Sequence, residues 1–284
     1  MKTNLIEHTH APVSFRCVRT LLSVTPAPLL HSIAMSAGAV HYALAAGKRR
    51  HYRRNTAPVA ALRGERIRHV RAFQNHALNV LEMLKALSEP PDLIKERVSI
   101  SGTAHIDAAL DAGAGCLLAT CHFGNWELAG IALSARGYPV TTVAGEQMNA
   151  SWSDGLKEWK RGCGITVISP GSGYRRLYRH LRENRTVVLH IDGNLFSRGI
   201  TIPFLGEPRS FPRGPAHISR ATRAPVAFAV CRRTGGRRFA VTIDAPLPAP
   251  DSDAGERTVT ETLIGRMEKC ILAEPEQWCI FRGI

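Results

Sequence analysis

From residue 98 onward, short apolar segments alternate with helical ones, and this alternation constrains the fold more than any other feature. The apolar segments are "VSISG", "GCLLATC", "YPVTTVAG", "ITVISPG" and "TVVLHIDG", with the helical patterns "SWSDGLKEWKRG" and "YRRLYRHLREN" among them. Two more strand patterns, "APVAFAVCRR" and "RFAVTIDAPL", follow a loop rich in Pro and Gly, and a C-terminal amphipathic helix comes last. Strands covered on both faces have nearly continuous apolar sequences. The chain is therefore predicted to form an α/β domain with a mixed, largely parallel sheet.

The N-terminal part has a different character. Residues 20–47 contain no Asp, Glu, Lys or Arg, and the basic cluster "KRRHYRR" follows at residues 48–54. An apolar stretch beside a cationic cluster favours binding to anionic lipid, so residues 1–55 are predicted to form a membrane-associating segment. Whether residues 20–47 span the bilayer stays open, because Ser, His, Gly and two prolines dilute the stretch. A buried helix followed by a solvated basic turn, or a cleaved signal peptide ending in "ALAAG", are the alternatives.

Residues 56–284 are predicted to form a single domain. Within it, residues 63–87 have a helical pattern of leucines that "EPPD" terminates, because proline cannot continue a helix.

Charge and cysteine content restrict the partners and the compartment. The formal net charge is +14, mostly from arginine, which favours acidic partners such as a carrier protein, an anionic membrane, a phosphorylated ligand or nucleic acid. Nucleic acid is the least favoured, since no zinc-finger spacing or recognition helix is evident. The seven cysteines lack regular spacing and their odd number leaves one unpaired, which indicates a reducing cytosolic environment and no zinc site.

The run "TCHFGNWELAG" at residues 120–130 places His122 and Glu127 close together after a strand pattern. Residues five apart lie on different faces of a regular helix, so a joint role requires a strand end, a turn at Gly124 and a new helix capped by Asn125. Glu127, in the first helical turn, is then expected to reach back to the imidazole and fix its tautomer. Catalytic groups in α/β sheets gather at such strand ends.

Around this histidine no enzyme nucleophile is evident. Cys121 neighbours His122 on the strand and is expected to point to the opposite face, as a small core residue. No serine stands in a G-x-S-x-G turn. A base without a nucleophile indicates activation of a hydroxyl group on the substrate.

The segment "HFGNWELAG" resembles the H-x-x-x-x-D/E signature of the lysophospholipid acyltransferase superfamily, in the form typical of the bacterial lipid A biosynthesis acyltransferases. The block "IDGNLFSRGITIPFLGEPRSFPRGPAHISRATRAPVAFAV" is similar to a second block of that family. The resemblance implies a three-layer αβα fold like that of the glycerol-3-phosphate acyltransferases. It also implies transfer of an acyl chain from a thioester to a lipid hydroxyl at the cytoplasmic face of the bacterial inner membrane, without a metal or bound cofactor.

The same resemblance assigns site residues. His122 and Glu127 correspond to the catalytic dyad of the family. Asp192 corresponds to an aspartate of the second block, although a turn residue before Gly193 is the alternative. Where many relatives have R-P-x-x-N, this chain has "GEQMN", which keeps Asn149 and places Gly145 at the arginine position. This departure puts a lipid A precursor in doubt as the acceptor.

Further substrate-binding candidates are Asn125, Asn149, Arg161, Asp192, Arg198 and Arg213. The expected acyl donor is acyl-acyl carrier protein, with acyl-coenzyme A as the alternative. Arg175, Arg179 and Arg182 form a cationic helix stripe suited to docking an acidic carrier, although a solvated helix face gives the same pattern. Lysophospholipid acylation, acylation of another lipid hydroxyl, and thioester hydrolysis are the alternative activities.

Overall fold

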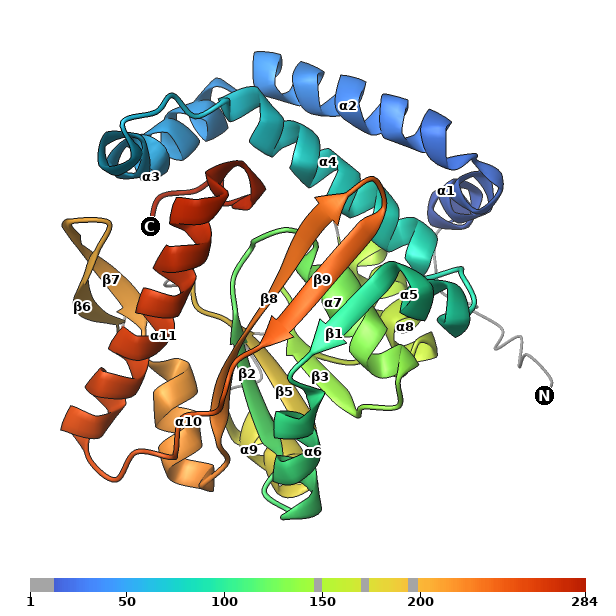
Figure 1. Cartoon of the computed structure of the whole chain (residues 1–284). Coiled ribbons are helices and arrows are strands. Elements are labelled where there is room, and N and C mark those ends of the chain that lie inside the picture. Colours follow the sequence, from blue (N-terminus) through green and yellow to red (C-terminus); the bar gives the residue numbers. More distant parts are fainter. Residues whose placement is uncertain (1–12, 146–149, 170–173, 194–198) are drawn as a thin grey trace.

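A seven-stranded sheet runs through the middle of the protein (Figure 1). The computed structural model describes residues 13–145, 150–169, 174–193 and 199–284. In spatial order the strands are β1 (Val98–Ser101), β9 (Arg238–Ile243), β8 (Val226–Gly235), β2 (Cys116–Thr120), β5 (Thr186–His190), β3 (Val140–Val143) and β4 (Thr166–Ile168). The strands β8, β2, β5, β3 and β4 are parallel, whereas β9 is antiparallel to β8. The prediction of a mixed, largely parallel sheet is confirmed.

Helices cover both faces of this sheet (Figure 1). One face packs against α5 (Pro91–Arg97), α6 (Thr103–Asp111), α7 (Trp126–Ala135) and α8 (Ala150–Gly162). The other packs against α9 (Tyr174–Arg182), α10 (Gly214–Thr222) and α11 (Asp253–Ala273). The central strand β2 is buried throughout, with Leu118 in the first core and Leu117 in the second. Burial on both faces explains why its sequence is apolar without alternation.

Four helices precede the sheet: α1 (Val13–Val24), α2 (Ala27–Leu44), α3 (Ala46–Arg63) and α4 (His69–Ala86). Helix α2 lies along α4, and Gly38 permits this close packing because a Cβ there would overlap the backbone of Gln74 (Figure 1). The boundary predicted between the N-terminal segment and the following domain, after residue 55, falls inside α3. The buried Tyr52 of this helix donates a hydrogen bond to the Pro275 carbonyl at 2.9 Å.

No single helix in the described ranges is long and apolar enough to cross a bilayer. Helices α2 and α3 meet the length and composition requirement only as a pair, and they are bent by 93° relative to each other.

Two antiparallel strands, β6 (Gly199–Phe204) and β7 (Glu207–Pro212), form a hairpin beside α11 where the sequence indicated a loop (Figure 1). Its turn contains Leu205 and Gly206, both with positive φ. A leucine in this conformation gives no turn signal, and prolines within a strand pattern argue against a strand.

Candidate active site

The carboxyl ends of β2 and β5 form the site. These strands are parallel neighbours, and Thr120 pairs in register with His190. His122 and Asp192 each follow two residues later, so the register brings them side by side at one edge of the sheet. In parallel α/β sheets this edge is where ligands and catalytic groups gather.

Asp192 holds His122 through two hydrogen bonds. The Nδ1 atom of His122 lies 2.7 Å from Oδ1 of Asp192, and the backbone N–H of His122 donates to Oδ2 at 2.7 Å. Trp278 donates a third hydrogen bond from Nε1 to Oδ2 at 3.1 Å. The Asp192 side chain is fully buried, whereas that of His122 is 27% exposed. The imidazole is therefore anchored on one side and accessible on another.

The electrostatics of the pair follow from this geometry. Burial alone would raise the pKa of Asp192, but the neighbouring His122 and its hydrogen bonds lower that pKa well below its ordinary value. An ionised carboxylate only accepts hydrogen bonds, so Nδ1 of His122 carries the proton. The other ring nitrogen, Nε2, is then free to act as a base.

Glu127 has a different partner from the one expected. Its Oε2 accepts a hydrogen bond from Nζ of Lys160 on α8 at 2.6 Å, and the Lys160 side chain is only 3% exposed. Burial works to raise the pKa of Glu127, but the Lys160 ammonium lowers it below its ordinary value. The expectation that Glu127 orients the imidazole is wrong, because Asp192 occupies Nδ1 and Lys160 directs the Glu127 carboxylate toward α8.

Aromatic rings enclose His122. The Trp126 ring packs edge-on against it with centroids 4.9 Å apart, and the His190 ring lies 4.3 Å away at an interplanar angle of 31°. Burial, with a further contribution from His122, lowers the pKa of His190 to about 3. His190 is therefore neutral at physiological pH and adds no positive charge beside His122.

The turn after β2 agrees with the sequence prediction in most respects. Gly124 has φ of +55°, and a Cβ there would overlap the carbonyl of Cys231. Asn125 caps α7 by accepting a hydrogen bond from the Leu128 N–H at 3.1 Å, as predicted. It is also fully buried, so direct substrate contact by Asn125 is ruled out in this conformation. Cys121 is fully buried as well, and burial raises the pKa of its thiol well above the ordinary value, as expected of a core residue.

Of the remaining predicted site residues, the structure describes only Arg161 and Arg213. Asn149 and Arg198 lie outside the described residues. Arg161 is exposed on α8, and Arg213, the N-cap residue of α10, lies 3.9 Å from Glu256 of α11 in an ion pair. Within the described ranges, no group of three or more His, Cys, Asp and Glu side chains is arranged to hold a metal ion.

Three residues of the site were not predicted: Lys160, His190 and Trp278. Trp278 is 86 positions from Asp192 in the sequence, and no local motif links the two. His190 ends β5 two residues before Asp192, and this spacing was a usable signal, because residues two apart in extended chain point to the same side.

Comparison with known proteins finds similarity to acyltransferases that act on lipids. The family model described as bacterial lipid A biosynthesis acyltransferase matches residues 14–283. A phosphatidylinositol mannoside acyltransferase of Mycobacterium tuberculosis is 35% identical over 185 residues, which is 63% of this chain and 57% of that protein. A protein of the same name from Mycolicibacterium smegmatis is 30% identical over 191 residues, 64% of this chain and 60% of that protein. The matches thus span less than two thirds of the length of these relatives.

Proposed function

Because the chain belongs to the bacterial lipid A biosynthesis acyltransferase family, we propose that it transfers a fatty acyl chain from a thioester to a hydroxyl group of a membrane lipid. The observation that carries the proposal is the His122–Asp192 pair at the carboxyl edge of the sheet. It supplies an oriented base, while the adjacent Cys121 is buried and protonated. We further propose that the sheet and its two helical layers have the glycerol-3-phosphate acyltransferase architecture.

In the proposed mechanism, Nε2 of His122 removes the proton from the acceptor hydroxyl as the oxygen attacks the thioester carbonyl carbon. Asp192 stabilises the imidazolium that forms. The tetrahedral intermediate then expels the thiolate, which takes the proton from Nε2, and the products are an ester and a free thiol. The acyl thioester is the only co-substrate in this scheme.

We propose that Glu127 also contributes to catalysis. It does so through its ion pair with Lys160 and not by a hydrogen bond to His122. A buried ion pair at this distance fixes both side chains and places a compensated charge at the edge of the site. The kcat of Asp192→Asn distinguishes a catalytic dyad of His122 and Glu127, as the motif predicts, from a dyad of His122 and Asp192.

A glycolipid is the proposed acceptor. The family name refers to lipid A and the two relatives are named for phosphatidylinositol mannoside, and both lipids carry sugar hydroxyls. The test is mass spectrometry of total lipids from cells that lack the gene and from cells complemented with the wild type or His122→Ala. Loss of one acyl chain from one lipid class, restored only by the wild type, is expected. Restoration by His122→Ala would refute the role of the histidine, and free fatty acid as the only product would indicate a thioesterase.

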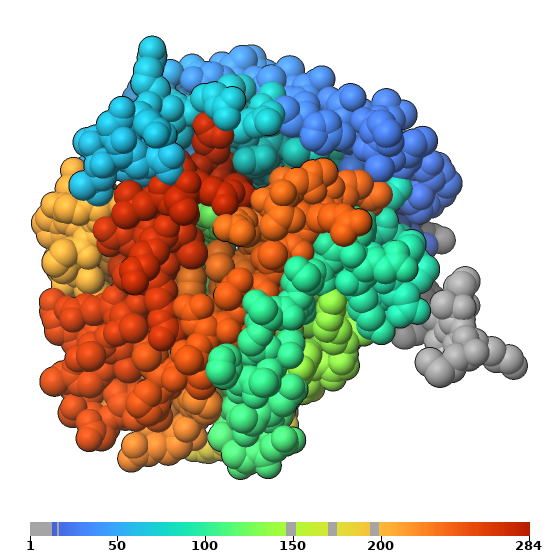
Figure 2. All heavy atoms as spheres, viewed as in Figure 1, coloured from blue at the N-terminus to red at the C-terminus, as the bar shows by residue number. Residues whose placement is uncertain are grey.

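A membrane surface is the proposed location of the reaction, at the cytoplasmic face of the inner membrane. Ten large hydrophobic side chains are exposed in the described ranges, and seven of them lie on the first two helices: Val13, Leu21, Val24, Leu29, Ile33, Val40 and Leu44. Helix α2 has no Asp, Glu, Lys or Arg, and exposed cations follow on α3 at Lys48, Arg50, Arg53 and Arg54. Figure 2 shows these helices along one edge of the molecule. Apolar side chains next to cations match an anionic bilayer surface.

Sedimentation with phosphatidylglycerol vesicles tests this surface. Ile33 and Leu93 are 47% and 46% exposed, but only Ile33 lies on α2. Ile33→Glu is expected to weaken binding to the vesicles, whereas Leu93→Glu leaves it unchanged. Equal binding by both variants would exclude α2 from the membrane contact.

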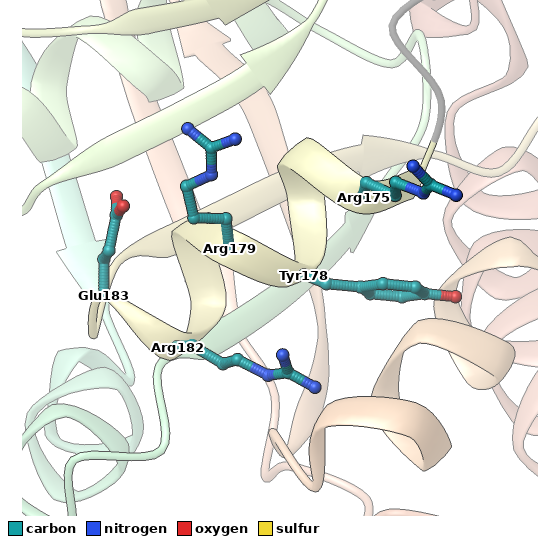
Figure 3. Close-up of a pocket in the computed structure, with 5 residues that line it drawn as sticks. All are labelled: Arg175, Tyr178, Arg179, Arg182 and Glu183. Carbon is teal, nitrogen blue, oxygen red and sulfur yellow. The ribbon is translucent and has the colours of Figure 1, made fainter.

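Helix α9 is the proposed docking element for the donor. A surface pocket of about 390 Å³ is lined by Arg175, Tyr178, Arg179, Arg182 and Glu183 (Figure 3). The three arginines are exposed on this helix. We propose that they contact the acidic surface of an acyl carrier protein, or the phosphates of coenzyme A.

The docking proposal predicts a rise in KM for the donor when Arg179 and Arg182 are both replaced by Glu. The charge-matched control replaces the exposed Arg238 and Lys269, which lie on β9 and α11. The KM is measured with the same acyl chain carried by acyl carrier protein and by coenzyme A, and the comparison identifies the donor. An unchanged KM for both donors would remove α9 from the proposal.

A further inference from the structure

A buried ion pair lies behind the turn that carries His122. Arg233 of β8 contacts Glu82 of α4 with both ends of its guanidinium, Nη1 to Oε1 at 2.8 Å and Nη2 to Oε2 at 2.7 Å. The side chains are 13% and 4% exposed. Burying two charges has a large desolvation cost, and apolar residues of similar size often stabilise a protein as well. The pair therefore needs an explanation beyond stability.

The hydrogen bonds of the pair lead to the turn after β2. Nη2 of Arg233 also donates to Oδ1 of Asn79 at 2.8 Å, and Asn79 in turn donates from Nδ2 to the carbonyl of Gly124. The next residue, Asn125, donates from Nδ2 to the Asn79 carbonyl and to Oε2 of Glu82, both at 3.3 Å. The ion pair thus fixes the two residues on which the turn depends.

The C-terminal segment holds the same turn from another direction. The Gln277 side chain accepts from the N–H of Arg233 at 2.8 Å and donates to its carbonyl at 3.0 Å. The Gln277 carbonyl accepts from the Gly124 N–H at 2.9 Å, and the N–H of Cys279 donates to the carbonyl of His122 at 2.7 Å. Arg233 is therefore the residue to which both sets of contacts connect.

We propose that Glu82 and Arg233 are positioning residues for acyl transfer, which fix the backbone of Gly124 and Asn125 and thereby the imidazole of His122 against Asp192. The proposal rests on the proposed function of His122 as the base. Neither residue of the ion pair needs to contact the substrate. A displacement of about 1 Å at a reacting group reduces the rate about 100-fold, so loss of the pair reduces kcat and leaves donor binding intact.

The experiment replaces both members at once, Glu82→Met with Arg233→Met, so that no unpaired charge stays buried. The matched control is the pair of Glu89 and Arg97, with side chains 13% and 16% exposed, replaced in the same way together with Arg237, which also pairs with Glu89. Each protein is compared with the wild type for Tm, for kcat and KM with an acyl thioester, and for the rate at which diethyl pyrocarbonate modifies His122.

The Glu82/Arg233 double variant is expected to lose about 100-fold in kcat, with KM within about threefold of the wild type and an altered His122 modification rate. The Glu89/Arg97/Arg237 variant is expected to keep all three values. If the double variant does not fold, Asn79→Ser replaces it, because this change removes the bond to Gly124 and keeps the ion pair. Wild-type kcat and modification rate in the folded variant would overturn the proposal.

Absence of acyl-transfer activity in the wild-type protein would contradict the proposed function and not the positioning role of the ion pair. The modification rate of His122 still tests the positioning in that case.

Discussion

Replacing Asp192 with asparagine removes the charge of the buried carboxylate and keeps its size. The carboxylate accepts three hydrogen bonds, from Nδ1 and the backbone N–H of His122 and from Nε1 of Trp278. One amide oxygen can replace Oδ2 and accept the last two. The amide NH₂ then faces Nδ1, which can accept its hydrogen bond only by giving up its proton. The imidazole is consequently held in the tautomer protonated on Nε2, which cannot act as the base.

The expected effect of Asp192→Asn is therefore a fall in kcat of about 10⁴-fold, as for orienting carboxylates in comparable triads, with little change in KM. Neutral hydrogen bonds replace the charge-assisted ones of the carboxylate, so the free energy of unfolding should fall by about 2 kcal/mol. This corresponds to a Tm lowered by about 4–8 °C. Product formation by mass spectrometry and thermal unfolding measure the two effects separately.

The pH dependence gives a second check on the same variant. The pKa of Asp192 is lowered in the folded protein, so its contribution to stability is present above the unfolded-state pKa of about 3.9 and is lost as the pH falls toward the folded-state pKa. The stability difference between the wild type and Asp192→Asn should shrink as the pH falls below about 4. Full kcat in Asp192→Asn together with an inactive Glu127→Gln would refute the reasoning and restore Glu127 as the partner of His122.

Three other variants test the surroundings of the site. Gly124→Ala should lower the free energy of unfolding by at least about 2 kcal/mol, because the φ of Gly124 is +55° and a Cβ has no room there. Gly130 lies in a helix with open space around it, so Gly130→Ala should raise the free energy of unfolding by roughly 0.5–1 kcal/mol. The same denaturant titration measures both variants. Lys160→Met should raise the pKa of Glu127, followed by NMR titration, and lower the free energy of unfolding by about 3 kcal/mol at pH 7, with recovery when Glu127→Gln is added. His190→Gln should lose less stability than the wild type as the pH falls from 6.5 to 4. Burial holds the pKa of His190 at about 3 in the folded protein, so protonation of the wild-type residue favours the unfolded state. Equal losses of the free energy of unfolding in denaturant titrations would contradict this.

The sheet was predictable because strands buried on both faces have a distinctive composition. Every strand of the seven-stranded sheet corresponds to an apolar segment identified from the sequence. The elements that escaped prediction are short or atypical. Helix α6 (Thr103–Asp111) occupies a brief connection between two strands, and the β6–β7 hairpin contains prolines and a leucine with positive φ. Their conformations depend on packing against neighbours rather than on local preference.

The site was predictable only as far as one segment determines it. His122 as the base candidate, Cys121 in the core and Asn125 as the cap all depend on the strand–turn–helix geometry of residues 116–135. The partner of His122 depends on which strand lies next to β2 in the sheet. Strand β2 lies between β8 and β5, and β5, which leads to Asp192, is separated from β2 in the sequence by β3 and β4. Proximity in the sequence therefore pointed to Glu127, whereas the parallel register of β2 and β5 brings Asp192 to the imidazole.

The same register explains how two carboxylates at one site acquire different surroundings. Asp192 follows β5 and, among the described residues, accepts hydrogen bonds from His122 and Trp278, so its charge is directed to His122. Glu127 lies in the first turn of α7, where the helix dipole and Lys160 both favour its ionised form. Each carboxylate thus has its own cationic or donor partner, and the two charges do not compete for one proton. The surroundings of the two carboxylates therefore depend on β5 and α8 as well as on the motif itself.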